Sequence, residues 1–119
     1  MKKILIILMC FNALICSALT IEEVREEIYA QELPHPEIVL QQARLESGDF
    51  RSKLTKTHNN ILGLKSGRRY KKYDSYKDCI ADYKNRISSR YKGGCYYSFL
   101  KRIRYASHPS YIRLLKRIR

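Results

Sequence analysis

The sequence lacks the residue patterns that several kinds of active site require. Its three histidines, His35, His58 and His108, are scattered, and no metal-ligand spacing is present. There is no glycine loop for phosphates and no nucleophile elbow. We therefore expect no metal and no cofactor. Tryptophan is also absent, which leaves ten tyrosines as the main aromatic side chains for packing the core.

Acidic residues are scarce. The whole chain has 24 Lys and Arg but only 11 Asp and Glu, for a net charge of +13. Residues 21–38 hold six Glu and one Arg, a balance of −5, whereas residues 39–119 hold 21 cations and five acids, a balance of +16. Lys2 and Lys3 complete the sum. A basic exported domain is suited to anionic cell-wall polymers or lipid head groups. Nucleic acid is the usual partner of a basic cytosolic chain, and export argues against it.

The only long apolar run covers residues 4–19 and follows Lys2 and Lys3. It is short for a membrane span, which needs about 20 residues. The basic start, the apolar run and the small residues at its end indicate a signal peptide over residues 1–20, cleaved after Ala18 or after Thr20. We expect an exported protein, in the periplasm, the cell envelope or outside the cell, with no stable membrane anchor.

The remaining residues, 21–119, are enough for one small domain, which we expect to be a monomer. Two of the four cysteines lie in the predicted signal peptide, and Cys79 and Cys95 remain. An even number of cysteines in an exported chain permits a disulfide, which would contribute about 3 kcal/mol. Two free thiols, with Cys79 filling the core face of a helix, are the alternative.

Hydrophobic periodicity predicts a mainly α fold with a small β element, in the α+β class. We expect helices over residues 21–31 and 36–47, from 76 to 87 and from 96 to 104, and a last helix after Pro109. The capping boxes Thr20–Glu23 and Ser75–Asp78 mark two of the starts. Residues 48–60 are predicted to be a loop, and residues 61–65 and 69–73 a short hairpin.

Glu46 is the candidate with the clearest chemistry. Val39, Ala43 and Glu46 are spaced i, i+4, i+7, which places the carboxylate on the buried face of a helix that ends before Gly48. Burial and the negative end of the helix dipole both disfavour ionisation there, and a protonated carboxyl suits a general acid. A glutamate that reaches solvent or pairs with a neighbouring arginine is the alternative.

Residues 39–65 read VLQQARLESGDFRSKLTKTHNNILGLK. This segment resembles the glucosaminidase domain of glycoside hydrolase family 73, whose members cleave peptidoglycan. In that family a helix ends in Glu-Ser-Gly, and a loop leads to Asn-Leu-Phe-Gly-Ile-Lys. The similarity continues into YDS at 73–75, IADY at 80–83 and YASHPSY at 105–111.

The resemblance spans roughly residues 37–118 and implies a lysozyme-like helical domain with a short hairpin. It implies an endo-β-N-acetylglucosaminidase that acts on peptidoglycan glycan strands, with Glu46 as general acid and Tyr105 as a cleft tyrosine. It also implies five substrate-binding positions: Ser47, Asn60, Gly63, Tyr73 and Asp74. The alternatives are core packing for Tyr105, a backbone-bonded hydroxyl for Ser47 and a turn glycine at position 63.

A second carboxylate is missing from the place where the family often has one, because residues 65–73 contain no Asp or Glu. Asp74 is the nearest substitute and Asp49 the next. A route assisted by the substrate's N-acetyl group, or a transglycosylase route that closes a 1,6-anhydro ring, needs only Glu46 and positioning groups. A non-catalytic cationic wall-binding protein, and a membrane-active one based on residues 96–119, are the remaining alternatives.

Overall fold

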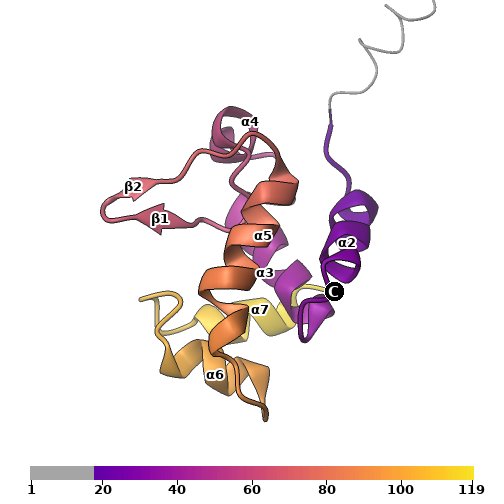
Figure 1. Cartoon of the computed structure of the whole chain (residues 1–119). Helices are drawn as coiled ribbons and strands as arrows, with labels where there is room; N and C mark the ends of the chain where they lie inside the picture. The colour runs from indigo at the N-terminus through magenta and orange to yellow at the C-terminus, as the bar shows by residue number, and fades with distance from the viewer. Residues whose placement is uncertain (1–17) are drawn as a thin grey trace, which may run out of the picture.

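The computed structural model describes residues 18–119 and is mainly helical, with one small antiparallel hairpin (Figure 1). The predicted signal peptide falls mostly on residues 1–17, outside the described part. The elements, in order, are α2 (Ile21–Ala30), α3 (Pro36–Ser47), α4 (Lys53–His58), β1 (Lys65–Ser66), β2 (Arg69–Tyr70), α5 (Tyr76–Arg86), η1 (Ser88–Arg90), α6 (Tyr96–Arg102) and α7 (Tyr111–Arg117). The predicted fold class, mainly α within α+β, is confirmed.

Helix α3 links the parts of the fold, because it contacts both α2 and α7, while α5 packs on α2. Pro36 occupies its first turn, and Gly48 ends it in the left-handed conformation, with φ +58°. That ending is why the sequence places a glycine directly after Glu-Ser. The hairpin projects from the body on the side away from α2 (Figure 1).

Local capping signals were partly right. Thr20 caps α2 as predicted: its hydroxyl accepts from the Glu23 amide at 3.1 Å and donates to the Glu23 carboxylate at 3.0 Å. Ser75 precedes α5, but its side chain makes no capping hydrogen bond. The amide of Asp78 bonds the Ser75 backbone carbonyl instead, at 3.2 Å, so the second capping box does not form.

Two predictions about the middle of the chain were wrong in detail. Residues 48–60 are not simply a loop, because they contain α4, whose N-cap Ser52 accepts from the amide of Thr55 at 3.2 Å. The hairpin is in the predicted place, but each strand has only two residues, paired Lys65 with Tyr70 and Ser66 with Arg69. All four strand residues are exposed. Neither strand therefore buries a face that would stabilise a longer pairing.

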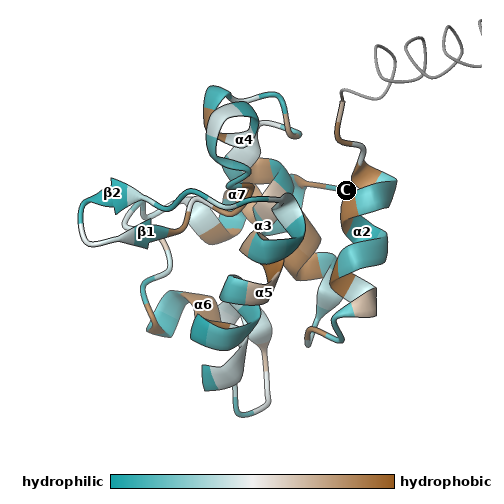
Figure 2. Cartoon of the chain, turned by 45° about the horizontal axis from the view of Figure 1, so that its top comes forward, coloured by the Kyte–Doolittle hydropathy of each residue, from teal (hydrophilic) through white to brown (hydrophobic). Residues whose placement is uncertain are grey.

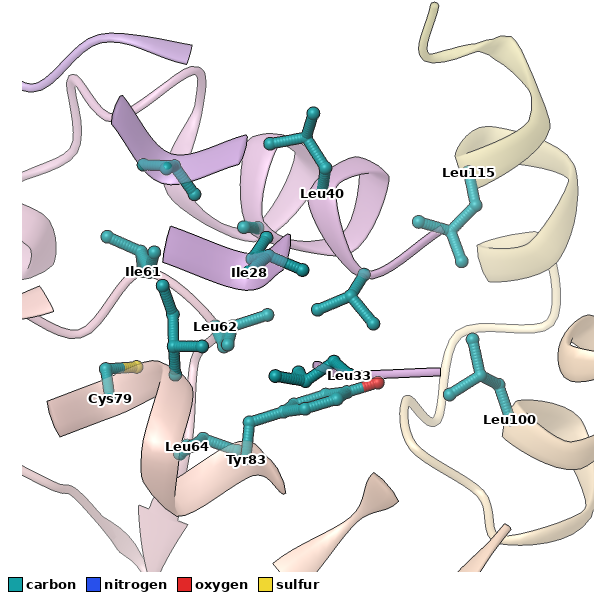
Figure 3. Packing of buried hydrophobic residues seen from close by; sticks show 14 of the residues in the cluster. Ile28, Leu33, Leu40, Ile61, Leu62, Leu64, Cys79, Tyr83, Leu100 and Leu115 are labelled. Atoms are coloured by element: carbon teal, nitrogen blue, oxygen red, sulfur yellow. The ribbon is translucent and has the colours of Figure 1, made fainter. Parts of the chain in front are cut away.

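The core draws apolar side chains from nearly every helix and from the segment before β1 (Figure 3). Its largest fully buried aromatic side chains are Tyr83, Tyr96 and Phe99, which take the place that tryptophan would have in other small domains. The labelled residues of Figure 3 show the range of elements involved: Ile28, Leu33, Leu40, Ile61, Leu62, Leu64, Cys79, Tyr83, Leu100 and Leu115. No helix among the described residues is long and apolar enough to span a membrane.

The two cysteines of the domain are free, so the disulfide that the sequence permits is not formed. Cys79 is fully buried on the core face of α5, whereas Cys95 is exposed at the start of α6. Burial raises the pKa of the Cys79 thiol to about 11, which keeps it protonated and unreactive.

Asn60 holds the segment that leads into the hairpin. Its amide nitrogen donates to the carbonyls of Leu64 at 2.8 Å and Lys71 at 2.9 Å, and its oxygen accepts from the Leu64 amide at 3.0 Å. The side chain is almost completely buried, so these bonds replace water for backbone groups at the base of the hairpin.

We expect Asn60→Ala to destabilise the protein by about 3 kcal/mol, because several buried backbone groups would lose their partners at once. Urea unfolding followed by circular dichroism measures the change. Asn85→Ala, at an exposed position of α5, is the control and should stay within about 0.5 kcal/mol of the wild type. Equal stabilities of the two variants would contradict this role of Asn60.

Candidate active site

Glu46 lies in the last turn of α3 and packs against the backbone at Gly63. A Cβ atom on Gly63 would lie 2.9 Å from Oε2 of Glu46, closer than such atoms approach in proteins, and φ at Gly63 is +65°. Any other residue would be strained by the left-handed backbone, and its Cβ would force the Glu46 carboxyl to move. The predicted motif residue Gly63 thus lies beside Glu46, whose side chain stays half-exposed.

Burial raises the pKa of the Glu46 carboxyl above its ordinary value of 4.5. The phenol of Tyr111, as a hydrogen-bond donor, and the positive charge of Lys65 act in the opposite direction, and burial outweighs both. A half-exposed carboxyl with a raised pKa can carry a proton to a ligand at the surface, which is what a general acid must do.

Buried polar side chains connect the core with Glu46. The hydroxyls of Tyr96 and Tyr83 lie 2.7 Å apart, and Tyr83 donates to the side-chain oxygen of Gln42. The Gln42 amide nitrogen donates to the hydroxyl of Tyr111 at 3.3 Å. With Gln42 in this orientation, Tyr83 donates to Gln42 and Gln42 donates to Tyr111. Tyr111 in turn acts as a donor that favours the ionised form of Glu46.

Tyr105 is in the neighbourhood that the resemblance implies, but its hydroxyl is engaged. It donates to the backbone carbonyl of Leu62 at 2.7 Å, next to Gly63, and its ring stacks on that of Tyr111 with centroids 5.9 Å apart. Burial raises the pKa of Tyr105 well above its ordinary value, and the charge of Glu46 adds to this. These contacts suit a residue that positions the segment facing Glu46.

Ser47 and Asn60 hold the scaffold. The Ser47 hydroxyl donates to the Ala43 carbonyl at 2.6 Å and accepts from the Phe50 amide at 2.8 Å, and the side chain is buried. Asn60 is equally buried, and its amide serves the base of the hairpin. In this structure both side chains serve the backbone around Glu46, and their predicted contact with substrate stays a prediction.

Tyr73 and Asp74, the other two predicted substrate-binding side chains, lie near the base of the hairpin and the start of α5. The Tyr73 hydroxyl donates to Asp82, and Asp74 is exposed, with its backbone carbonyl accepting from the side chain of Asn59 at 3.2 Å. No contact in the described residues links either of them to Glu46, so the structure does not bring these two predicted positions into the site.

Two acids outside the hairpin, Asp82 of α5 and Asp49 after α3, are engaged in ion pairs. Asp82 accepts from Lys71 at 2.8 Å, from Tyr73 and from Arg86 at 3.3 Å. Partial burial would raise its pKa, but these hydrogen bonds hold it below the ordinary value. Asp49 pairs with Arg44 at 2.8 Å.

Glu46 lines neither of two hollows in the described surface. One, of about 850 Å³, lies between the start of α2 and the chain that follows α3, and includes Leu19 and Phe50. The other, of about 180 Å³, lies beside α7 and includes His108 and Tyr111. Among the described residues, no cluster of His, Cys, Asp and Glu could hold a metal ion.

A model of the glucosaminidase family, described as mannosyl-glycoprotein endo-beta-N-acetylglucosaminidase, matches residues 22–119. This chain belongs to the glucosaminidase family. The family supports a glycoside hydrolase that acts on peptidoglycan. No curated protein and no solved structure matches the chain significantly.

Sequence reasoning missed two residues of the site, Gln42 and Tyr111. Gln42 precedes Glu46 by one helical turn and is fully buried, so a polar residue on the apolar face of α3 was the available signal. Tyr111 ends the motif YASHPSY and is buried in the core, and its hydroxyl also favours the ionised form of Glu46. Nothing local in the sequence pairs α7 with α3.

We expect Glu46→Gln to make the stability of the protein less dependent on pH. Because the folded state raises the pKa of Glu46, it binds this proton more tightly than the unfolded state does. Stability is therefore lost as pH rises from the ordinary carboxyl range through the raised pKa, and above it stays constant. Glutamine does not ionise, so the substitution removes this loss. The free energy of unfolding of Glu46→Gln near pH 7 should therefore equal or exceed that of the wild type.

Urea unfolding at a series of pH values from 4 to 8 measures this difference. Glu26→Gln is the matched control, because this glutamate of α2 is exposed and its carboxylate makes no ion pair or hydrogen bond within the described residues. It should leave the pH dependence in that range unchanged. A wild type that gains stability relative to Glu46→Gln as pH rises would contradict the raised pKa.

Proposed function

We propose that this chain is an exported peptidoglycan hydrolase, an endo-β-N-acetylglucosaminidase that cleaves the β-1,4 bond between N-acetylglucosamine and N-acetylmuramic acid. The observation that carries the proposal is Glu46, a half-exposed carboxyl with a raised pKa, held against the backbone of Gly63 at the end of a helix. Membership of the glucosaminidase family supports the substrate class.

Glu46 would give its proton to the glycosidic oxygen as the bond to the anomeric carbon breaks. The carboxylate left behind would be stabilised by the hydroxyl of Tyr111 and by the charge of Lys65, which both favour the ionised form. Gln42 holds the Tyr111 hydroxyl in turn. Stabilisation of the charge that develops during proton transfer is a general source of rate enhancement.

The ion-paired Asp82 and Asp49 favour a mechanism with one enzyme carboxylate. The acetamido oxygen of the substrate would attack the anomeric carbon and form a bicyclic oxazolinium ion. A water molecule would then open that ring and give its proton to Glu46, which restores the acid. The net reaction adds one water across the glycosidic bond.

The same observation favours a second candidate, a lytic transglycosylase. Here a sugar hydroxyl at C6 attacks the anomeric carbon and its proton passes to the carboxylate of Glu46, so that a 1,6-anhydro ring forms and no water is consumed. The products of the two reactions differ by the mass of one water molecule.

Export is part of the proposal and rests on the basic, then apolar N-terminus. Cleavage after Ala18 would retain Thr20, whose hydroxyl caps α2, whereas cleavage after Thr20 would remove that cap. Capping residues of this kind contribute about 1 kcal/mol, which favours the earlier site.

Digestion of purified peptidoglycan by residues 19–119 tests the function. Products are reduced with borohydride and identified by mass spectrometry, for the wild type, Glu46→Gln and the control Glu26→Gln. We expect reduced N-acetylglucosamine ends from the wild type and the control, and at least a 100-fold lower rate for Glu46→Gln.

Anhydro ends that depend on Glu46 would assign the transglycosylase reaction. Binding to insoluble peptidoglycan without release of fragments, from a folded wild type, would contradict both reactions and indicate a wall-binding protein. Activity of Glu46→Gln equal to that of the wild type would remove Glu46 from the mechanism.

We expect Tyr111→Phe to shift the alkaline limb of the pH–rate profile to higher pH, because the lost donor no longer lowers the pKa of Glu46. The rate at the optimum should fall about 10-fold, since a hydrogen bond to a charged group contributes about 1.5 kcal/mol. Tyr97→Phe is the control, because the Tyr97 hydroxyl bonds Gln41 at 2.7 Å instead. An unmoved alkaline limb would exclude Tyr111 from setting the acidity of Glu46.

A further inference from the structure

The hairpin combines a strong positive charge with full exposure. Residues 65–72 read KSGRRYKK, with five cationic side chains and no carboxylate. Both strands are exposed along their length, and they form a hydrophilic projection from the helical body (Figures 1 and 2). The hairpin therefore contributes little to the apolar core, so packing does not explain its cationic composition.

Most of these charges have no acidic partner. Lys71 pairs with Asp82 at 2.8 Å. Within the part of the chain that the structure describes, no carboxylate lies within ion-pair distance of the other four cations, Lys65, Arg68, Arg69 and Lys72. Like charges this close repel one another, and that repulsion is relieved when an anion binds.

The base of the hairpin is fastened on several sides, so its cations sit on an ordered support. Arg86 donates to the Lys65 carbonyl at 2.9 Å, and Asn60 donates to the Lys71 carbonyl at 2.9 Å. The Lys71 amide also bonds the Leu64 carbonyl at 2.9 Å. An ordered set of charges loses less conformational entropy on binding than a flexible basic tail does.

The hairpin is also adjacent to the candidate acid. Gly63, which touches Glu46, precedes β1 by only two residues, and the charge of Lys65 acts on Glu46. A polymer with a glycosidic bond at Glu46 is thus close enough to lie along the hairpin. Tyr70, with 48% of its surface exposed and Lys65 at 4.9 Å from its ring centre, provides an apolar face among the cations.

We propose that the cationic hairpin, residues 65–72, is a binding surface for the carboxylates that peptidoglycan carries and that neutral N-acetylglucosamine polymers lack. The ligand follows from the proposed function, and the charge complementarity is a property of the hairpin itself. The hairpin thereby favours a charged, peptide-bearing strand over a neutral glycan at the same site. Arginine forks fit planar carboxylates in two-point contacts, which makes Arg68 and Arg69 the main candidates.

The test measures binding in a Glu46→Gln background, so that cleavage does not alter the polymer. Sedimentation with insoluble peptidoglycan at low ionic strength compares this protein with a version that also carries Arg68→Gln and Arg69→Gln. A matched control carries Arg90→Gln and Arg117→Gln, which remove two exposed charges from η1 and α7. Thermal unfolding verifies that all three proteins are folded.

The same proteins are tested on three further polymers. Chitin is the neutral β-1,4 glycan. Peptidoglycan whose carboxyls have been converted to amides lacks the proposed ligand. Peptidoglycan stripped of phosphate polymers with hydrogen fluoride keeps its carboxylates, and so separates them from teichoic phosphates.

We expect the hairpin variant to bind native and phosphate-stripped peptidoglycan about tenfold more weakly, since each of two exposed ion pairs contributes up to about fivefold in affinity. The control should change less than about twofold. The hairpin variant and its Glu46→Gln parent should bind chitin and amidated peptidoglycan with equal affinity. Equal weakening of variant and control, no weakening of either, or an effect that disappears with the phosphate polymers would overturn the proposal.

This result is independent of the proposed reaction. If wild-type protein releases no fragments while the hairpin variant shows the expected loss of binding, the hydrolase proposal fails and the binding surface stands. If fragments are released and the hairpin substitutions leave binding unchanged, the surface is wrong and the reaction stands.

Discussion

The contact between the Glu46 carboxyl and the backbone of Gly63 determines the arrangement of the candidate site. A Cβ atom at position 63 would lie 2.9 Å from Oε2 of Glu46 and would force the carboxyl away from the segment that enters the hairpin. Asn60 and Tyr105 hold that segment from opposite ends, through the Leu64 backbone and the Leu62 carbonyl. The scaffold residues thus act on Glu46 through the backbone they fix.

The acidity of Glu46 results from opposing effects of similar origin. Burial disfavours the charged form, whereas Tyr111 and Lys65 favour it, and burial prevails. A carboxyl without donors would bind its proton too tightly to release it, and a fully solvated one would lose it before meeting a substrate. The partly buried position at a helix end, with a donor supplied from α7, lies between these limits.

Features that depend on residues close together in the chain could be predicted from the sequence, whereas features that depend on residues far apart in the chain could not. Glu46, Gly48 and the helix between Pro36 and Ser47 could be predicted, because proline, spacing and glycine are local signals. The hairpin was located by its glycine and its flanking apolar residues. Its two-residue strands were not anticipated, since neither strand acquires a buried face.

The remaining features depend on partners distant in the chain. The sequence does not reveal that Asn60 bonds Lys71 or that Tyr111 comes from α7 to reach Gln42 and Glu46. Ser47 is a further example. The sequence locates it at the end of α3, but does not reveal that its hydroxyl donates to the Ala43 carbonyl and accepts from the Phe50 amide. The absence of a carboxylate in residues 65–73 was visible in the sequence, whereas the pairing of Asp82 with Lys71 and Arg86 was not.

The central claim concerns the proton on Glu46, and the most direct measurement is its titration. Carbon-13 NMR of protein labelled at the glutamate carboxyl, with the Glu46 signal assigned by its loss in Glu46→Gln, follows that group alone. The account predicts that the pKa of Glu46 lies above the ordinary value of 4.5. Substitutions that expose the carboxyl to water should bring this pKa closer to 4.5, and loss of the Tyr111 hydroxyl should raise it further. A Glu46 that titrates at or below the ordinary value would contradict the account.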